Sequence, residues 1–113
     1  MKFLILYLPY NAIEKAMKTT NEYLQLLKKF KHTRAAHYGI TSIGIFGSVA
    51  RGSQSGNSDV DVFYKSNTMS LLDAVGLWQE LEDLFGSHVD AVSVHDRLNP
   101  LFKKRIETEG IYA

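Results

Sequence analysis

Two strand-like segments in the middle of the chain limit its fold more than any other feature of the sequence. Residues 40–46 are rich in β-branched and aromatic side chains, and residues 59–64 alternate with a period of two. Between them, residues 52–58 are glycine and polar residues, a composition typical of a loop. Residues 89–93 repeat the alternation. We therefore expect a small β-sheet.

Helices are predicted between and around the strands, because three stretches begin with a residue that favours a helix N-terminus. These residues are Thr19, Ser70 and Asn99. Glu22 completes a capping-box pattern with Thr19, and Pro100 suits the first position of a helix. A glycine follows each of the first two stretches and predicts its end. The expected fold class is α/β, of the α+β type, with a small mixed β-sheet flanked by helices.

The second predicted helix carries a repeat of apolar side chains at helical spacing. Its members are Leu71, Leu72, Val75, Trp78, Leu81 and Phe85. We interpret Trp78 and its apolar neighbours as core packing. Near the end of the chain, Tyr112 has two interpretations, because it can pack against the core or against a partner protein.

The length of the chain allows one domain. With 113 residues, 45% of them hydrophobic, the chain can fill one core and leaves no room for a second full domain. A substrate-recognition lobe is therefore expected to be absent or to come from another chain. We predict a single domain over residues 17–113 and an extension outside the fold over residues 1–16. The alternative is that residues 3–8 add an edge strand.

Charge and composition exclude several classes of function. The net charge is +1, and we interpret the basic residues within 28–34 and 103–105 as solvated, so direct nucleic-acid binding is not expected. The lack of cysteine excludes disulfides, thiol catalysis and cysteine-bound zinc, and it fits a cytoplasmic location. The apolar run at residues 3–8 is short for a signal peptide, and no stretch approaches the length of a membrane span.

Two carboxylates project from one side of the second strand. Strand side chains alternate between faces, so Asp59 and Asp61 point the same way. Like charges at this spacing destabilise a strand, and a divalent cation such as Mg²⁺ removes the conflict. Taken alone, the pair also fits an exposed polar face that tolerates two acids.

A glycine and a serine stand where the first strand ends. Gly47 allows backbone amides to approach a phosphate closely, and the Ser48 hydroxyl can bind the same group. Residues 49–51 are expected to begin a short helix, with Arg51 near its end. The spacing of a Walker A loop is absent. Alone, this pair fits an ordinary turn.

Together these pairs resemble the signature of the polymerase-beta-type nucleotidyltransferase superfamily. The stretch is Gly47-Ser48, ten residues, then Asp59-x-Asp61, and it is most similar to the minimal nucleotidyltransferase (MNT) branch. The resemblance implies a minimal polymerase-beta-like fold with a third carboxylate on a neighbouring strand. Asp90 is the candidate for this carboxylate, and Asp96, in the loop that follows, is a weaker rival.

The resemblance also implies roles for the site residues. Asp59 and Asp61 would hold the Mg²⁺ ion that bridges the nucleotide phosphates, whereas Asp61 and Asp90 would hold a second ion beside the acceptor hydroxyl. Asp90 is also a candidate acceptor for the hydroxyl proton.

The phosphate-binding set implied by the resemblance comprises Gly47, Ser48, Arg51 and Ser58. Within it, Arg51 has a plainer interpretation, because a loop arginine often forms only a surface salt bridge.

The function implied is Mg²⁺-dependent transfer of AMP from ATP to a hydroxyl of a partner protein. Stand-alone members of the branch commonly pair with a small helical HEPN-type protein, as the antitoxin of a toxin–antitoxin module. Two alternatives stay open: a catalytically silent, nucleotide-binding antitoxin that acts by complex formation, and a nucleotidyltransferase for a small, aminoglycoside-like molecule.

Overall fold

The computed structural model describes residues 18–55 and 59–113, so the predictions for residues 1–16 and for Ser58 lie outside the described residues. The elements follow one another along the chain as α3 (Thr20–Arg34), η1 (Ala35–Tyr38), β1 (Ile40–Phe46), α4 (Gly47–Arg51), β2 (Val60–Ser66), α5 (Leu71–Phe85), β3 (Val89–Ser93), α6 (Pro100–Glu109) and β4 (Ile111–Tyr112). None of the helices in these two ranges is long and apolar enough to cross a membrane.

A four-stranded mixed sheet forms the centre of the molecule, with the order β3-β2-β1-β4. β1 pairs antiparallel with β2 and β4, whereas β2 and β3 run parallel and are joined through α5. The expected mixed sheet is confirmed. Because of these directions, the last residue of β1 and the first residues of β2 and β3 meet at the same end of the sheet.

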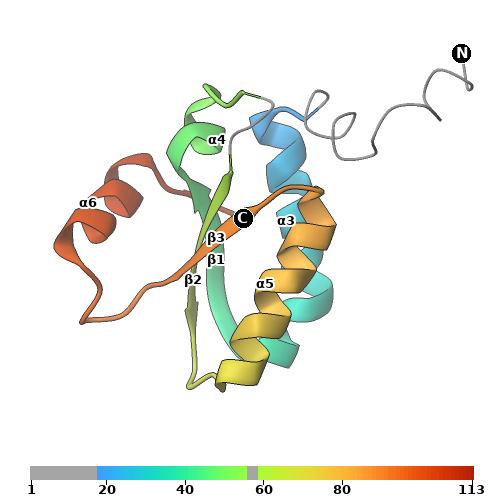
Figure 1. Ribbon diagram of the computed structural model, residues 1–113, viewed down its shortest axis with the longest axis vertical. Helices are drawn as coiled ribbons and strands as arrows, with labels where there is room; N and C mark the ends of the chain where they lie inside the picture. The colour runs from blue at the N-terminus through green and yellow to red at the C-terminus, as the bar shows by residue number, and fades with distance from the viewer. Residues whose placement is uncertain (1–17, 56–58) are drawn as a thin grey trace, which may run out of the picture.

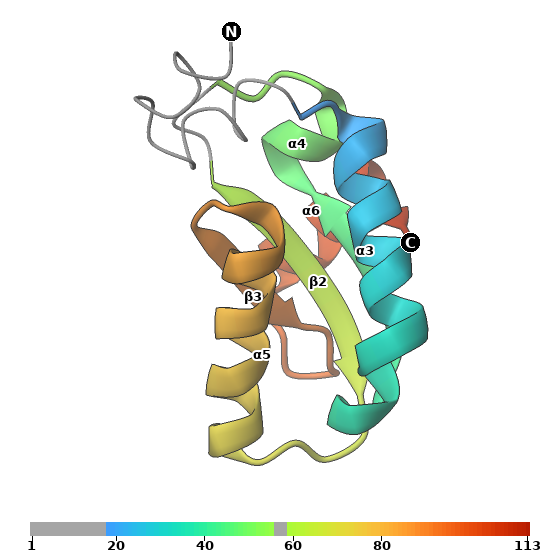
Figure 2. The ribbon, with the colours of Figure 1, turned by 90° about the vertical axis from the view of Figure 1, so that its right-hand side faces the viewer.

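Helices cover both faces of this sheet, with α3 and α5 on one face and α6 on the other (Figures 1 and 2). Side chains of β2 alternate between the two layers: Val60 and Val62 belong to the larger core under α3 and α5, whereas Phe63 packs with Phe46 and Ile106 of α6. The same alternation places Asp61 on the α6 face.

The predicted helix starts are confirmed by their capping contacts. Thr19 Oγ1 accepts the Glu22 N–H at 3.2 Å, and the Glu22 carboxylate accepts the Thr19 N–H in return. Ser70 Oγ accepts the N–H of Asp73 at 3.1 Å, and Asn99 caps α6 through the N–H of Leu101 at 2.9 Å. These side chains satisfy backbone donors that the first turn of a helix leaves unpaired.

The core face of α5 differs from the one expected. Leu77, Leu81 and Phe85, at i, i+4 and i+8, are fully buried. The prediction of core packing is confirmed for Leu81 and Phe85 and is wrong for Trp78 and the three apolar residues before it, because only one narrow stripe of this helix lies over the core. Exposed side chains on α5 are Leu71 (82%), Leu72 (82%), Val75 (42%) and Trp78 (42%).

Candidate active site

Carboxylates from β2 and β3 lie side by side at one end of the sheet. Asp61 and Asp90 are register partners in the parallel pair, and Asp59 immediately precedes β2, two residues from Asp61. Asp61 is half-buried, whereas Asp59 and Asp90 are exposed. The structure separates Asp96 from this group, because it follows β3 in the loop near Lys65, at the opposite end of the strands.

The charge of this group is only partly compensated. Burial raises the pKa of the Asp61 carboxyl, and the negative charges of Asp90 and Asp59 raise it further, while the guanidinium groups of Arg105 and Arg51 oppose the shift. Within residues 18–55 and 59–113, no three acidic or histidine side chains converge closely enough to form a ready metal site. The oxygen donors and the unbalanced negative charge nevertheless fit a hard divalent cation such as Mg²⁺.

Gly47 lies against the Asp61 carboxylate. Its φ is +71°, and a Cβ atom at this position would stand 2.1 Å from Asp61 Oδ2. Both the backbone conformation and the available space therefore require glycine here. As predicted from the sequence, the turn after β1 leads into a short helix, α4, whose first turn contains Ser48.

The groups predicted to bind phosphate contact an acidic side chain from the end of α6. Glu109 Oε2 accepts the backbone N–H of Gly47 at 3.1 Å, and Glu109 Oε1 pairs with Arg51 Nη1 at 3.0 Å. Arg51 therefore forms a salt bridge, which was the plainer of its two interpretations from the sequence.

Two residues near the site were missed in the sequence analysis, Glu109 and Arg105. The Arg105 guanidinium carbon lies 5.4 Å from the centroid of the Phe46 ring, and its charge lowers the pKa of Asp61. The available signal for Glu109 was weak: an acidic residue in the last turn of a helix opposes the helix dipole and so suggests a partner elsewhere.

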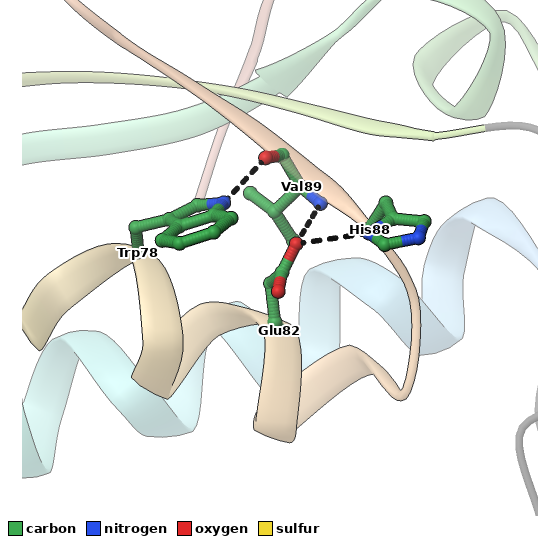
Figure 3. A network of polar contacts seen from close by, with 4 residues as sticks. All are labelled: Trp78, Glu82, His88 and Val89. Carbon is green, nitrogen blue, oxygen red and sulfur yellow. Dashed lines mark hydrogen bonds and ion pairs between the residues drawn. The ribbon is translucent and has the colours of Figure 1, made fainter. Parts of the chain in front are cut away.

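A polar network holds the beginning of β3, next to Asp90 (Figure 3). Trp78 Nε1 donates to the Val89 carbonyl at 2.9 Å, and Glu82 Oε2 accepts the Val89 N–H at 3.1 Å and lies 3.3 Å from His88 Nδ1. Since β3 is an edge strand, its outward backbone groups would otherwise lack protein partners. A cavity of about 450 Å³, lined in part by Asp59, Trp78 and Asp90, lies beside this network.

One protein-family model matches most of the chain. The model is described as polymerase beta, nucleotidyltransferase, and it matches residues 26–112. This range contains every described residue of the candidate site, from Gly47 to Glu109.

A curated relative and two solved structures are similar to the chain. A provisionally named protein adenylyltransferase of Methanocaldococcus jannaschii is 37% identical over 99 residues, which cover 85% of this chain and 99% of the relative. A provisionally assigned minimal nucleotidyltransferase has a TM-score of 0.69 and 31% identity, covering 84% of this chain and 96% of that one. The complex of the tri-AMPylated Shewanella oneidensis HEPN toxin with its MNT antitoxin matches with a TM-score of 0.57 and 22% identity, covering 79% and 68% of the two chains. This last likeness shows the fold alone.

Proposed function

The chain belongs to the polymerase beta nucleotidyltransferase family, and from this membership we propose that it transfers AMP from ATP to a hydroxyl group of a partner protein. One observation carries the proposal. The strand register sets Asp61 beside Asp90, and the turn at Gly47 lies directly against Asp61. The turn proposed to bind phosphate and a pair of carboxylates thus meet at one end of the sheet, and phosphoryl transfer requires such positioning together with charge neutralisation.

In this proposal the three carboxylates would hold Mg²⁺, with Asp59 and Asp61 on the nucleotide side and Asp61 and Asp90 on the acceptor side. When bound, the metal would supply positive charge that neutralises the phosphates and the oxygens of an in-line displacement. The half-burial of Asp61 and the like charges around it support this assignment, because both leave the site in need of a cation.

The remaining residues orient the reacting groups. The Gly47 N–H, the Ser48 hydroxyl and the Arg51 guanidinium bind the β- and γ-phosphates, and Ser58 stays a proposed member of this set. The acceptor oxygen then forms a bond to the α-phosphorus, the bond from that phosphorus to the bridging oxygen breaks, and pyrophosphate leaves. Asp90 accepts the proton of the acceptor hydroxyl.

The proposed acceptor is a small helical HEPN-type protein, to which this chain would be the antitoxin. The fold shared with an MNT antitoxin supports this partner, as does a relative named for protein adenylylation. A stripe of exposed apolar side chains on α5, at Leu71, Val75 and Trp78, offers a surface that a partner would cover. A cytoplasmic location, where ATP and such a partner occur together, belongs to the same proposal.

Intact mass spectrometry tests the proposal directly. The chain is incubated with Mg²⁺, ATP and the product of the neighbouring gene, the candidate HEPN-type partner, and the mass of that product is measured. We expect a gain of one or more AMP units that disappears in Asp59→Asn/Asp61→Asn and persists in Asp83→Asn, which removes an exposed carboxylate from α5.

The other outcomes identify the alternatives. A stable complex without any gain in mass would favour an antitoxin that acts by binding alone. Transfer of AMP to an aminoglycoside, with none to the protein, would favour a small-molecule acceptor.

A further inference from the structure

An internal carboxylate already occupies the groups assigned to the nucleotide phosphates. Glu109 uses both of its oxygens, Oε2 for the Gly47 N–H at 3.1 Å and Oε1 for Arg51 Nη1 at 3.0 Å. The Glu109 side chain is 23% exposed, so most of it is shielded from water. One anion thus spans a backbone amide and a guanidinium, as a phosphate group would.

The backbone that carries Glu109 is held firmly in place. The N–H of Gly110 caps α6 through the Ile106 carbonyl at 2.8 Å, and a Cβ at Gly110 would stand 2.3 Å from that same oxygen. Directly afterwards, β4 pairs with β1 at Gly44 and Ile45. Because the chain is anchored on both sides of Glu109, departure of its carboxylate from the Gly47 turn requires rotation of the side chain and not movement of α6.

Two anions already approach Gly47 from different directions. The Asp61 carboxylate lies where a Cβ would be, and the Glu109 carboxylate lies on the N–H. A third anion bound to the same amide would meet both negative charges at short range. A phosphate can therefore bind the Gly47 N–H only by taking the place of Glu109.

We propose that Glu109 is a built-in competitor of the nucleotide phosphates, which occupies their site until a polyphosphate displaces it. The proposal rests on the placement of the β- and γ-phosphates at Gly47 and Arg51. In the nucleotide-free protein, Glu109 satisfies the buried Gly47 amide and keeps Arg51 oriented. Ligands that carry little charge near Gly47 and Arg51 displace the Glu109 carboxylate poorly. The return of Glu109 to the Gly47 amide favours the release of pyrophosphate.

Binding measurements on charge-neutral variants test the competition. Isothermal titration calorimetry with Mg²⁺ would compare ATP and inorganic pyrophosphate on the full chain and on Glu109→Gln. We expect about three- to tenfold tighter binding of both ligands to the variant, the range that corresponds to the net contribution of one ordinary hydrogen bond. Glu107→Gln removes the same charge from an exposed position on the same helix and is expected to bind as the parent does.

A second variant keeps the test valid if Glu109→Gln folds poorly. Glu109→Asp keeps the charge but shortens the side chain, so it cannot span Gly47 and Arg51 together, and we expect an affinity between those of the parent and of Glu109→Gln. Unchanged or weaker binding in both variants, with AMP transfer by the parent intact, would overturn the competition and leave the proposed function standing. Failure of the parent and of both variants to bind ATP or pyrophosphate would overturn both.

Discussion

The Asp61 carboxylate lies directly against the α-carbon of Gly47, so that a Cβ there would stand 2.1 Å from Asp61 Oδ2 and 3.1 Å from Asp61 Cγ. The strands bring this about, because Phe46, the residue before Gly47, is the register partner of Asp61. The glycine therefore sets how closely the turn after β1 approaches the carboxylate proposed to bind metal.

We expect Gly47→Ala to impair both stability and transfer. The left-handed backbone at φ +71° costs about 1–2 kcal/mol for alanine, and the new Cβ pushes the Asp61 side chain out of position. Urea unfolding measures the first effect, and AMP transfer measured by mass spectrometry reports the second. The loss of transfer should exceed the fraction of protein that is unfolded.

Gly52→Ala is the matched control for this substitution. Gly52 has nearly the same φ, +72°, but the nearest heavy atom to an added Cβ is Thr20 Oγ1 at 3.6 Å. This variant should lose a similar amount of stability and keep its transfer activity. Equal losses of transfer in the two variants would contradict the importance of the approach between Gly47 and Asp61.

Asp61→Asn should separate stability from activity. Burial and the charges of Asp90 and Asp59 disfavour the ionised carboxylate and raise its pKa, so a neutral amide removes an unfavourable charge. In EDTA the variant should unfold at the same temperature as the parent or higher, although it loses transfer. Added Mg²⁺ should raise the unfolding temperature of the parent only. A lower unfolding temperature for the variant in EDTA would contradict this account of the site.

The ion pair between Arg34 and Glu80 predicts a pH-dependent difference in stability. Arg34 Nη2 and Nε donate to the Glu80 carboxylate at 2.6 and 3.2 Å, and this hydrogen bonding lowers the pKa of Glu80. A lowered pKa in the folded state means that the stabilisation is present above the unfolded pKa and is lost as the pH falls through the folded one. The stabilisation from this ion pair is small, because both side chains are more than a third exposed.

The measurement is thermal unfolding of the parent and of Glu80→Gln as a function of pH. The parent should be the more stable protein at neutral pH, and the difference should vanish on acidification. Moderate salt should reduce the difference in stability between the two proteins at neutral pH. A difference that persists at acidic pH would assign the effect to packing instead of charge.

Trp78→Phe should loosen the start of β3. The substitution removes the Nε1 donor and leaves the buried Val89 carbonyl without this hydrogen bond, at a cost of about 1–3 kcal/mol. Hydrogen exchange of the β3 amides should accelerate, as measured by mass spectrometry or NMR. Leu72→Ala, at a position that is 82% exposed on the same helix, should change little. Equal exchange rates in the parent and in Trp78→Phe would show that the network of Figure 3 does not hold the strand.

Local features of the structure could be predicted from the sequence because they depend on neighbouring residues. The cap at Thr19, the end of α5 at Gly86 and the short helix after Gly47 each follow from side-chain or backbone preferences within a few positions. The meeting of Asp61 and Asp90 was also predictable, since the resemblance to a known family supplied the strand arrangement that the spacing alone does not contain.

The sequence by itself therefore determined the helices, the first three strands, the family and the main candidate residues, but not β4. Only the tertiary structure decided which distant side chains contact the candidate site. Glu109 contacts Gly47, 62 positions earlier in the chain, and Arg105 lies over the ring of Phe46. It also decided that Trp78 holds the edge of β3 instead of filling the core. These contacts depend on how α5 and α6 pack against the sheet. No short pattern of residues specifies the packing angle of a helix or which of its side chains face the sheet.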